Sequence, residues 1–194
     1  DCESVQESVI VSSSDNEPPL ASVQNLQVYL DESGLASISA EDIDNASSDN
    51  CGIFEMNLNV SEFTCEDLNS ELDPLEVTLS VTDFSGNSAE SIALIALQDT
   101  LSPKALDRDI ILALDENGEA VIDVDDIDNG SSDNCAISIR EISKTEFTCE
   151  DLGQNEITLT VTDPSGNESH TSATVFIIDE NDPIVPDTLS GALY

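Results

Sequence analysis

Two stretches of the chain share almost the same letters and contain the side chains that could do chemistry. Residues 41–51 read E-D-I-D-N-A-S-S-D-N-C, and residues 125–135 read D-D-I-D-N-G-S-S-D-N-C. Each stretch holds aspartate, asparagine and serine close together and ends in a cysteine. Such oxygen-rich sets are ligands of hard cations, and calcium takes about six to eight oxygens. The stretches therefore indicate calcium sites, and a solvated acidic loop is the alternative.

A second motif, D-x-S-G-N, occupies 83–87 and 163–167. Because strand direction alternates in a sandwich, this turn, the acidic stretch and the segment arriving from the preceding repeat should meet at one end. The expected ligands at the first copy are Asp15, Asp42, Asp44, Asp49, Asn50, Asp83 and Asn87. Those at the second copy are Asp99, Asp126, Asp128, Asp133, Asn134, Asp163 and Asn167, and a third set begins with Asp179, Asn181 and Asp182. Flexible carboxylate loops suit calcium better than magnesium, and turn formation alone is the alternative for Asn87 and Asn167.

The chain is strongly acidic, with a net charge of −38 and only four lysine and arginine side chains. Such a surface repels nucleic acids and anionic membranes, which are therefore excluded as partners. Since 39% of the residues are apolar and fall in alternating runs, a packed core is expected rather than disorder. Cation binding, a halophilic habitat and plain solubility all fit the acidic excess, and the clustering of aspartate favours cation binding. No apolar run of about 18 residues is present, so no membrane span is expected.

Five cysteines are present, and two of them recur in each copy at the same spacing. Cys51 and Cys65 lie 14 residues apart, as do Cys135 and Cys149. Zinc sites usually show C-x-x-C spacing or several histidines, so disulfides in an exported protein are the better interpretation. The spacing predicts Cys51–Cys65 and Cys135–Cys149 bonds, each contributing about 3 kcal/mol. A bond between repeats, Cys65–Cys135, is the alternative, and Cys2 is expected to be unpaired.

The elements that must position these side chains are short strands with period-two alternation between turn residues. The clearest strand covers 156–162 (E-I-T-L-T-V-T) and is matched by 76–82. The other expected strands cover 26–30, 36–40, 110–114, 120–124, 135–142 and 169–178, with a short strand ending at 149. At most one helical turn is expected, at 66–68. About seven short strands in each repeat of roughly 80 residues predict an all-β fold of tandem immunoglobulin-like β-sandwiches.

The matching letters also divide the chain into repeats. Their offset is 84 up to the second cysteine of each copy and 80 afterwards, so the first copy carries four extra residues near 70–74. Repeat one is predicted to cover 19–102 and repeat two 103–182. Residues 1–18 read as the end of a preceding repeat and 183–194 as the start of a following one. We therefore expect the chain to come from a longer tandem array.

The order D-N-C, F-T-C, T-L-T-V-T-D-x-S-G-N and D-x-N-D-x-P resembles hyalin-type immunoglobulin-like repeats. It is most similar to the repeats of very large secreted surface adhesins of Bacteroidota, including those used in gliding. The resemblance covers nearly the whole chain and implies export to the cell surface and an extended filament. The last segment is similar to the calcium linkers of cadherins, from which D-T-L-S-P at 99–103 departs. D-T-L also resembles O-glycosylation sites of Bacteroidota, which implies glycan on Thr100 and Thr188.

No catalytic set of residues is found in the sequence. A serine triad needs a histidine as base, but the single histidine, His170, falls on an expected strand and has no counterpart in repeat one. We predict a non-enzymatic structural segment of a secreted, cell-surface adhesin or filament, with calcium-stiffened repeat junctions and neighbouring repeats as partners. The main alternative is a glycan- or protein-binding module attached to a secreted protein. A mineral-associated matrix protein is the third reading.

Overall fold

The computed structural model describes residues 14–69 and 74–179, which divide into two compact units. Residues up to Leu30, together with Leu35–Gln98, form the first unit, and Asp31–Gly34 joins the residues from Asp99 onward in the second. Both units are built from β-sheets, which confirms the predicted all-β fold of tandem immunoglobulin-like sandwiches. The predicted repeat boundaries stay predictions. Most of the expected remnant at 1–18, most of the expected insertion near 70–74 and the expected start of a following repeat at 183–194 lie outside the described residues.

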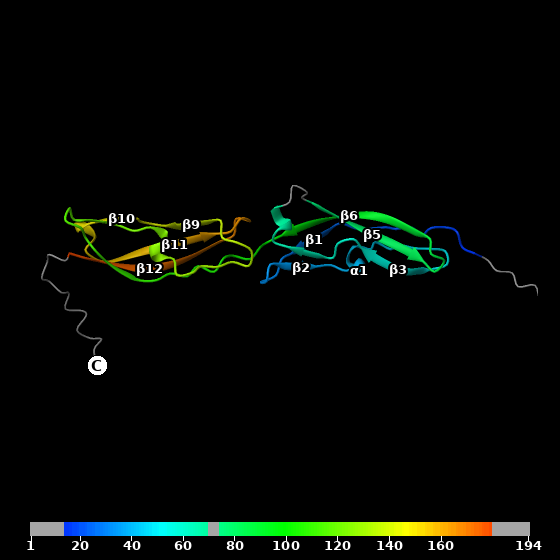
Figure 1. Ribbon diagram of the computed structural model, residues 1–194, viewed down its shortest axis with the longest axis horizontal. Helices are drawn as coiled ribbons and strands as arrows, with labels where there is room; N and C mark the ends of the chain where they lie inside the picture. The colour runs from blue at the N-terminus through cyan, green and yellow to red at the C-terminus, as the bar shows by residue number, and fades with distance from the viewer. Residues whose placement is uncertain (1–13, 70–73, 180–194) are drawn as a thin grey trace, which may run out of the picture. The chain divides into compact units, whose positions relative to one another are not determined.

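The first unit contains a four-stranded and a two-stranded sheet (Figure 1). The larger sheet has the order β1-β6-β5-β3, with β1 (Leu26–Tyr29), β6 (Ser88–Gln98), β5 (Leu75–Asp83) and β3 (Ile53–Leu58). Strand β1 runs parallel to β6, and the other neighbours are antiparallel. The smaller sheet pairs β2 (Leu35–Ser37) with β4 (Glu62–Thr64). Single bridges join Leu20 to Ser48 and Val23 to Asp44, so the segment before β1 runs along the acidic stretch.

The second unit repeats this arrangement strand for strand. Its larger sheet has the order β7-β12-β11-β9, with β7 (Ile110–Ala113), β12 (Glu168–Ile178), β11 (Gly153–Thr162) and β9 (Ile139–Ile142). Its smaller sheet pairs β8 (Glu119–Val121) with β10 (Glu146–Thr148). Bridges from Lys104 to Ser132 and from Asp107 to Asp128 join the segment before β7 to residues 125–135. We call the segment before the first strand of each unit its leading segment, and residues 41–51 and 125–135 the acidic stretches.

Each acidic stretch begins with a short helix that the sequence interpretation missed. The strands expected over 36–40 and 120–124 end at Ser37 and Val121, and α1 (Ala40–Ile43) and α2 (Val124–Ile127) follow. Capping boxes at Ser39 and Asp123 supply hydrogen bonds to the first helical turn. One-turn 3-10 helices also form, η1 (Asp67–Asn69) and η2 (Cys149–Asp151), near the single expected helical turn. In the described part of the chain, no helix is long and apolar enough to cross a membrane.

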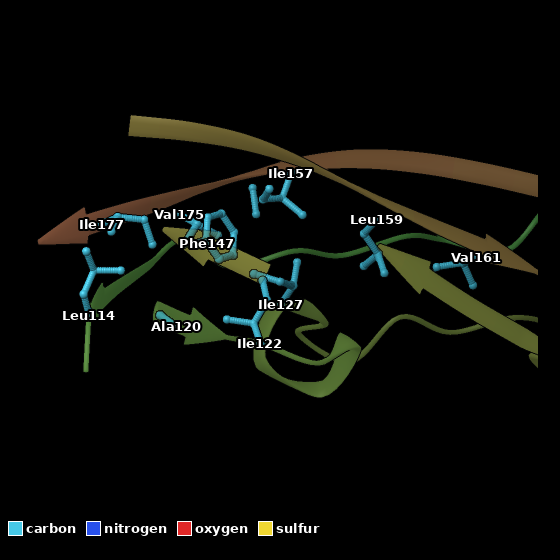
Figure 2. Packing of buried hydrophobic residues seen from close by; sticks show 11 residues of the cluster. Leu114, Ala120, Ile122, Ile127, Phe147, Ile157, Leu159, Val161, Val175 and Ile177 are labelled. Carbon is cyan, nitrogen blue, oxygen red and sulfur yellow. The ribbon is translucent and has the colours of Figure 1, made fainter. Parts of the chain in front are cut away.

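The core of the second unit lies between the long strands and α2 (Figure 2). Alternate residues of β11 face inward, and Ile157, Leu159 and Val161 are each at most 1% exposed. Ile127 of α2 and Phe147 of β10 pack into the same cluster, so the short helix buries one large side chain. This packing explains why the acidic stretch adopts a fixed shape: its apolar residue is held in the core, while its polar residues turn toward the end of the sandwich.

Candidate metal centre

The D-x-S-G-N turn of the second unit holds one carboxylate in a fixed position. Asp163 follows β11, is 2% exposed, and accepts hydrogen bonds from the backbone N–H and the side-chain amide of Asn167, both at 2.8 Å. The same amide donates to the carbonyl of Asp99 at 3.1 Å. Gly166, at φ +89°, permits the tight turn. Asn167 therefore ties the turn to the segment that leads into the second unit.

The acidic stretch brings a second carboxylate to the same end of the sandwich. One oxygen of Asp133, Oδ2, accepts hydrogen bonds from the backbone N–H groups of Cys135 at 2.9 Å and Ala136 at 3.1 Å. The other oxygen, Oδ1, is buried and has no hydrogen-bond partner. The backbone bonds thus fix the carboxylate with its unbonded oxygen turned away from solvent.

The leading segment supplies the third carboxylate. Asp99 is 6% exposed, and its Oδ1 accepts hydrogen bonds from the N–H of Leu101 at 3.1 Å and the Asn134 amide at 3.2 Å. Its Oδ2 is buried without a partner. One oxygen each from Asp99, Asp133 and Asp163 lies within 4.8 Å of the others. We call these three residues the second carboxylate cluster.

The first unit contains the equivalent first carboxylate cluster, formed by Asp15, Asp49 and Asp83, with oxygens again within 4.8 Å of one another. Asp49 accepts from the N–H groups of Cys51 at 2.7 Å and Gly52 at 3.0 Å, and the Oδ2 of Asp15 is buried without a partner. Burial raises the pKa of Asp83, but hydrogen bonds from the side chain and backbone of Asn87 and from neighbouring N–H groups outweigh it and lower the pKa. Asp83 therefore stays ionised at neutral pH.

Each cluster concentrates negative charge that a bound cation would balance. At an effective dielectric constant of 20, two unit charges about 4 Å apart repel by about 4 kcal/mol. Buried polar atoms without partners are rare in native proteins, and an ion is one of the few explanations for them. The hydrogen-bond donors to Asp99, Asp133 and Asp163 include asparagine amides and backbone N–H groups, which carry no formal charge. Oxygen donors on loops fit calcium, which accepts irregular coordination.

Four predicted ligands do not reach the clusters and have local structural roles instead. Asp42 and Asp126 accept hydrogen bonds from the N–H groups of Ser39 at 2.7 Å and Asp123 at 2.9 Å, completing the capping boxes. The hydrogen bond from the Ser39 backbone is the main cause of the lowered pKa of Asp42. Asp44 accepts from the N–H of Ser47 at 3.1 Å, and Asp128 is the equivalent residue of the second unit. These aspartates shape the acidic stretch rather than face a common ion.

The predicted asparagine ligands act as hydrogen-bond donors in the structure. The Asn87 amide donates to Asp83 at 2.7 Å and to the carbonyl of Asp15 at 3.3 Å. The Asn50 amide donates to Glu17 at 3.0 Å, a residue that the sequence interpretation did not single out. These bonds hold the leading segment over the cluster. Their role as metal ligands stays a prediction.

Two arginines of the second unit were also missed. Arg140 pairs with Asp128 at 2.6 Å and Asp125 at 2.9 Å, and Arg108 donates to the carbonyls of Asp125 and Asp126 at 2.6 and 2.7 Å. Repeat one has Gln24 and Met56 at the equivalent positions. The signal in the sequence is that all four lysine and arginine residues lie in the second repeat, two before and two after residues 125–135, and that the first repeat has none.

Asp128 is expected to make the second unit sensitive to acid. Burial raises the pKa of Asp128, but hydrogen bonds from Ser131 and the guanidinium of Arg140 outweigh it, so its pKa is lowered. The ionised carboxylate therefore stabilises the fold above its unfolded pKa of about 3.9, and this contribution is lost as the pH falls through the lower folded pKa. Asp128→Asn should lower the free energy of unfolding by about 1–2 kcal/mol at pH 7.

Urea unfolding at pH 7 and pH 3 measures this effect. The difference between wild type and Asp128→Asn should shrink at the lower pH. Asp44→Asn is the matched control because Asp44 accepts from Ser47 but has Met56 where the second unit has Arg140. A loss of stability that is equal at both pH values, or equal in the two variants, would contradict the role of Arg140.

The remaining predicted positions lie at the edge of the described residues or beyond it. Asp179 follows β12, as Asp99 follows β6, whereas Asn181, Asp182, Thr188 and Cys2 lie outside the described residues. Thr100 is exposed, so a glycan on it stays a prediction. His170 lies on β12, with its Nδ1 2.9 Å from the hydroxyl of Thr160.

The predicted disulfides Cys51–Cys65 and Cys135–Cys149 are wrong. Cys51 and Cys149 carry free, exposed thiols, whereas Cys65 and Cys135 are disulfide-bonded. A hydrogen bond with Asp15, followed by burial and the charges of the first carboxylate cluster, raises the pKa of the Cys51 thiol. Cys51 therefore lies at the cluster end of its unit, as Cys135 does in the other.

Distance explains the error in the second unit. Cys135 follows the cluster residue Asp133, and Asp163 of the same cluster lies directly after the last residue of β11. Cys149 lies beyond the first residue of β11, with its Sγ 3.8 Å from the carbonyl of Gly118. A strand of ten residues spans about 30 Å, whereas the Cα atoms of a disulfide lie within about 7 Å.

Comparison with known proteins gives only weak similarities. No protein-family model and no curated protein matches the chain. Drosophila N-cadherin EC1-4 matches with a TM-score of 0.41 and 13% identity over 84% of this chain and 50% of that one. Human mucin-like protocadherin EC1-2 (TM-score 0.40, 11% identity) is matched over 82% of this chain and 98% of that one. Protocadherin gamma B7 domains 1–4 (TM-score 0.40, 12% identity) is matched over 86% and 52%, so the chain spans about half of two of these structures.

Proposed function

We propose that this chain is a non-enzymatic structural segment of a secreted surface adhesin or filament, and that calcium binds in its two carboxylate clusters. The observation that carries the proposal is the set of buried carboxylate oxygens without hydrogen-bond partners, on Asp15, Asp99 and Asp133. Each of them belongs to a cluster of three aspartates. Leaving a buried acceptor unpaired costs about 1–3 kcal/mol, more when it is charged. Bound calcium would pair all three carboxylates of a cluster at once.

The place of the clusters in the chain suggests a mechanical role. Asp99 follows Gln98, the last residue of β6, without an intervening residue. A cation that holds Asp99 against Asp133 and Asp163 therefore holds the backbone directly after the last strand of the first unit. Asp179 stands in the same relation to β12. Calcium would in this way restrict the backbone directly after the last strand of each repeat.

The extracellular location rests on two features of the sequence. The ordered motifs resemble hyalin-type repeats of secreted Bacteroidota adhesins. The bonded cysteines, Cys65 and Cys135, are the second feature, because disulfides persist in oxidising compartments such as the cell exterior. A segment of a surface filament satisfies both features, with neighbouring repeats as its partners.

Calcium titration by calorimetry tests the proposal. We expect two calcium ions per chain and, at a hundredfold excess over Kd, a gain of about 2.7 kcal/mol in the stability of each unit. Scattering should show a stiffer chain with calcium than with sodium chloride at equal ionic strength, since sodium only screens the charges. If excess chelator leaves the melting temperature and the scattering-derived length unchanged, the clusters bind no calcium and the proposal is wrong.

A second candidate function, binding of a glycan or protein, is favoured by one pair of side chains. Phe54 and Phe84 are 61% and 69% exposed, and their ring centroids lie 5.6 Å apart in an edge arrangement. Repeat two has Ser138 and Pro164 at these positions, so the pair occurs in one repeat only. Exposed aromatic rings are common contact residues in recognition sites. Loss of surface adhesion in Phe84→Ala, with calcium binding unchanged, would favour this function.

A further inference from the structure

Two asparagines of the chain are followed directly by a glycine, in Asn117–Gly118 and Asn129–Gly130. In this dipeptide the glycine nitrogen can attack the side-chain carbonyl of the asparagine, because glycine has no Cβ to obstruct the approach. The attack needs no enzyme, and it releases ammonia. It requires an asparagine side chain that is free to rotate and a glycine N–H that no hydrogen bond holds. The two dipeptides differ in both respects.

The structure holds both reacting groups of Asn117–Gly118 in place. The side-chain amide of Asn117 donates to Oδ2 of Asp115 at 3.0 Å, and the N–H of Gly118 donates to the backbone carbonyl of Asp115 at 3.0 Å. The backbone N–H groups of Asn117 and Glu119 donate to Oδ1 of the same carboxylate at 2.8 and 2.9 Å. Attack at this site would therefore require the turn around Asp115 to open.

The reacting groups of Asn129–Gly130 are not held in this way. Both residues are exposed, and within the described residues neither the Asn129 side chain nor the Gly130 N–H makes a hydrogen bond. Gly130 has φ +87°, a conformation that glycine adopts without strain. The first unit has Asn45 and Ala46 at the equivalent positions, with Ala46 at φ +61°. The methyl group of Ala46 obstructs the same attack, so the reactive arrangement at this position belongs to the second unit.

We propose that Asn129 is a site of spontaneous deamidation in the folded chain and that Asn117 is protected from it. The nitrogen of Gly130 loses its proton and bonds to Cγ of Asn129, while the bond from Cγ to Nδ2 breaks and ammonia leaves with the proton. Water then opens the resulting five-membered ring at one of its two carbonyl groups. Opening at Cγ gives aspartate, and opening at the backbone carbonyl gives isoaspartate, in which the main chain runs through the former side chain. No electrons are transferred, and water is the only co-reactant.

An isoaspartate at position 129 would disturb the contacts between the acidic stretch and the leading segment of the second unit. The Asn129 N–H donates to the carbonyl of Leu106 at 2.9 Å, and the hydroxyl of Ser131 accepts from the N–H of Leu106 at 2.9 Å. Ser132 exchanges two backbone hydrogen bonds with Lys104, at 2.7 and 3.1 Å. An extra main-chain carbon between Asn129 and Ser131 moves these partners out of register. The modification is therefore expected to lower the melting temperature of the second unit, with or without calcium.

The test incubates the full chain in a mildly alkaline buffer and follows each asparagine by peptide mapping with mass spectrometry. Glu119 lies between Asn117 and Asn129, so cleavage after glutamate places them on separate peptides. In the folded chain, Asn129 should deamidate about tenfold faster than Asn117, which corresponds to about 1.4 kcal/mol in activation free energy. In concentrated urea, where the turn at Asp115 is lost, the two rates should become similar. Equal rates in the folded chain, or a difference that persists in urea, would overturn the proposal.

Matched variants exchange the residue after the asparagine between the two units. Gly130→Ala should slow the reaction at Asn129 about tenfold, and Ala46→Gly should accelerate the reaction at Asn45 by a similar factor, because the methyl group obstructs ring closure. Melting temperatures show whether each variant is folded. Ala46→Gly removes a side chain from a residue at positive φ, so this variant keeps its fold even if Gly130→Ala does not. An unchanged rate at Asn45 in Ala46→Gly would contradict the proposal.

Discussion

Asp133→Asn is expected to raise the free energy of unfolding of the second unit when calcium is absent. When calcium is present, the substitution should remove most of the stability that the bound ion adds to the unit. Without the ion, the buried Oδ1 of Asp133 has no partner and lies in a cluster of three carboxylates. An asparagine keeps an oxygen for the N–H groups of Cys135 and Ala136 and places an amide donor toward Asp99. The gain should be about 1–3 kcal/mol, the cost of one unsatisfied buried group. With calcium, the variant lacks one charged ligand and should bind the ion far more weakly.

Calorimetric melting with chelator measures the expected gain in stability, and melting with excess calcium measures the expected loss. The calorimetric stoichiometry of the variant should fall from two calcium ions to one, because the first carboxylate cluster is untouched. Glu116→Gln is the matched control, since it removes one negative charge from an exposed turn of the same unit. A variant that is destabilised under both conditions would show that Asp133 serves only the backbone of the loop.

Phe147→Ala should cost the second unit about 3–5 kcal/mol, which is the range for removing a buried phenylalanine. Phe147 is 1% exposed and packs in the cluster that includes Ile127, Ile157 and Val175. A loss of this size is a large share of the stability of a small domain. Calcium should offset part of it by mass action, because the ion binds the folded unit.

Urea unfolding of the variant, followed by hydrogen exchange of the β11 amides, isolates the second unit. Phe63→Ala, at the equivalent buried position of the first unit, should produce the same loss there and leave β11 protected. Phe84→Ala is the control, because it removes an aromatic ring that is 69% exposed. This substitution should change the free energy of unfolding by less than about 0.5 kcal/mol. Similar losses in Phe147→Ala and Phe84→Ala would contradict the described core.

The strands were predictable because their signal is local. In β11, residues 157, 159 and 161 are apolar and the residues between them are threonine, so the period-two pattern also gives the buried face. The helices α1 and α2 were not predictable from the same pattern. They are four residues long and are stabilised by capping boxes and by the burial of Ile43 and Ile127. This burial depends on strands that are distant in the sequence and form the core of each unit.

The repeated motifs, the sandwich class and the oxygen donors from which a cation site can be built are all readable in the order of the residues. Which of these donors come together depends on the folded chain: Asp99, Asp133 and Asp163 converge, while Asp128, five residues before Asp133, is paired with Arg140. The folded chain also places Cys135 and Cys149 at opposite ends of their unit. Both outcomes follow from the length of a strand, because each residue of a strand adds about 3.3 Å to the distance between its ends. Nearness along the chain therefore says little about nearness in space, which is set by the packing of strands into sheets.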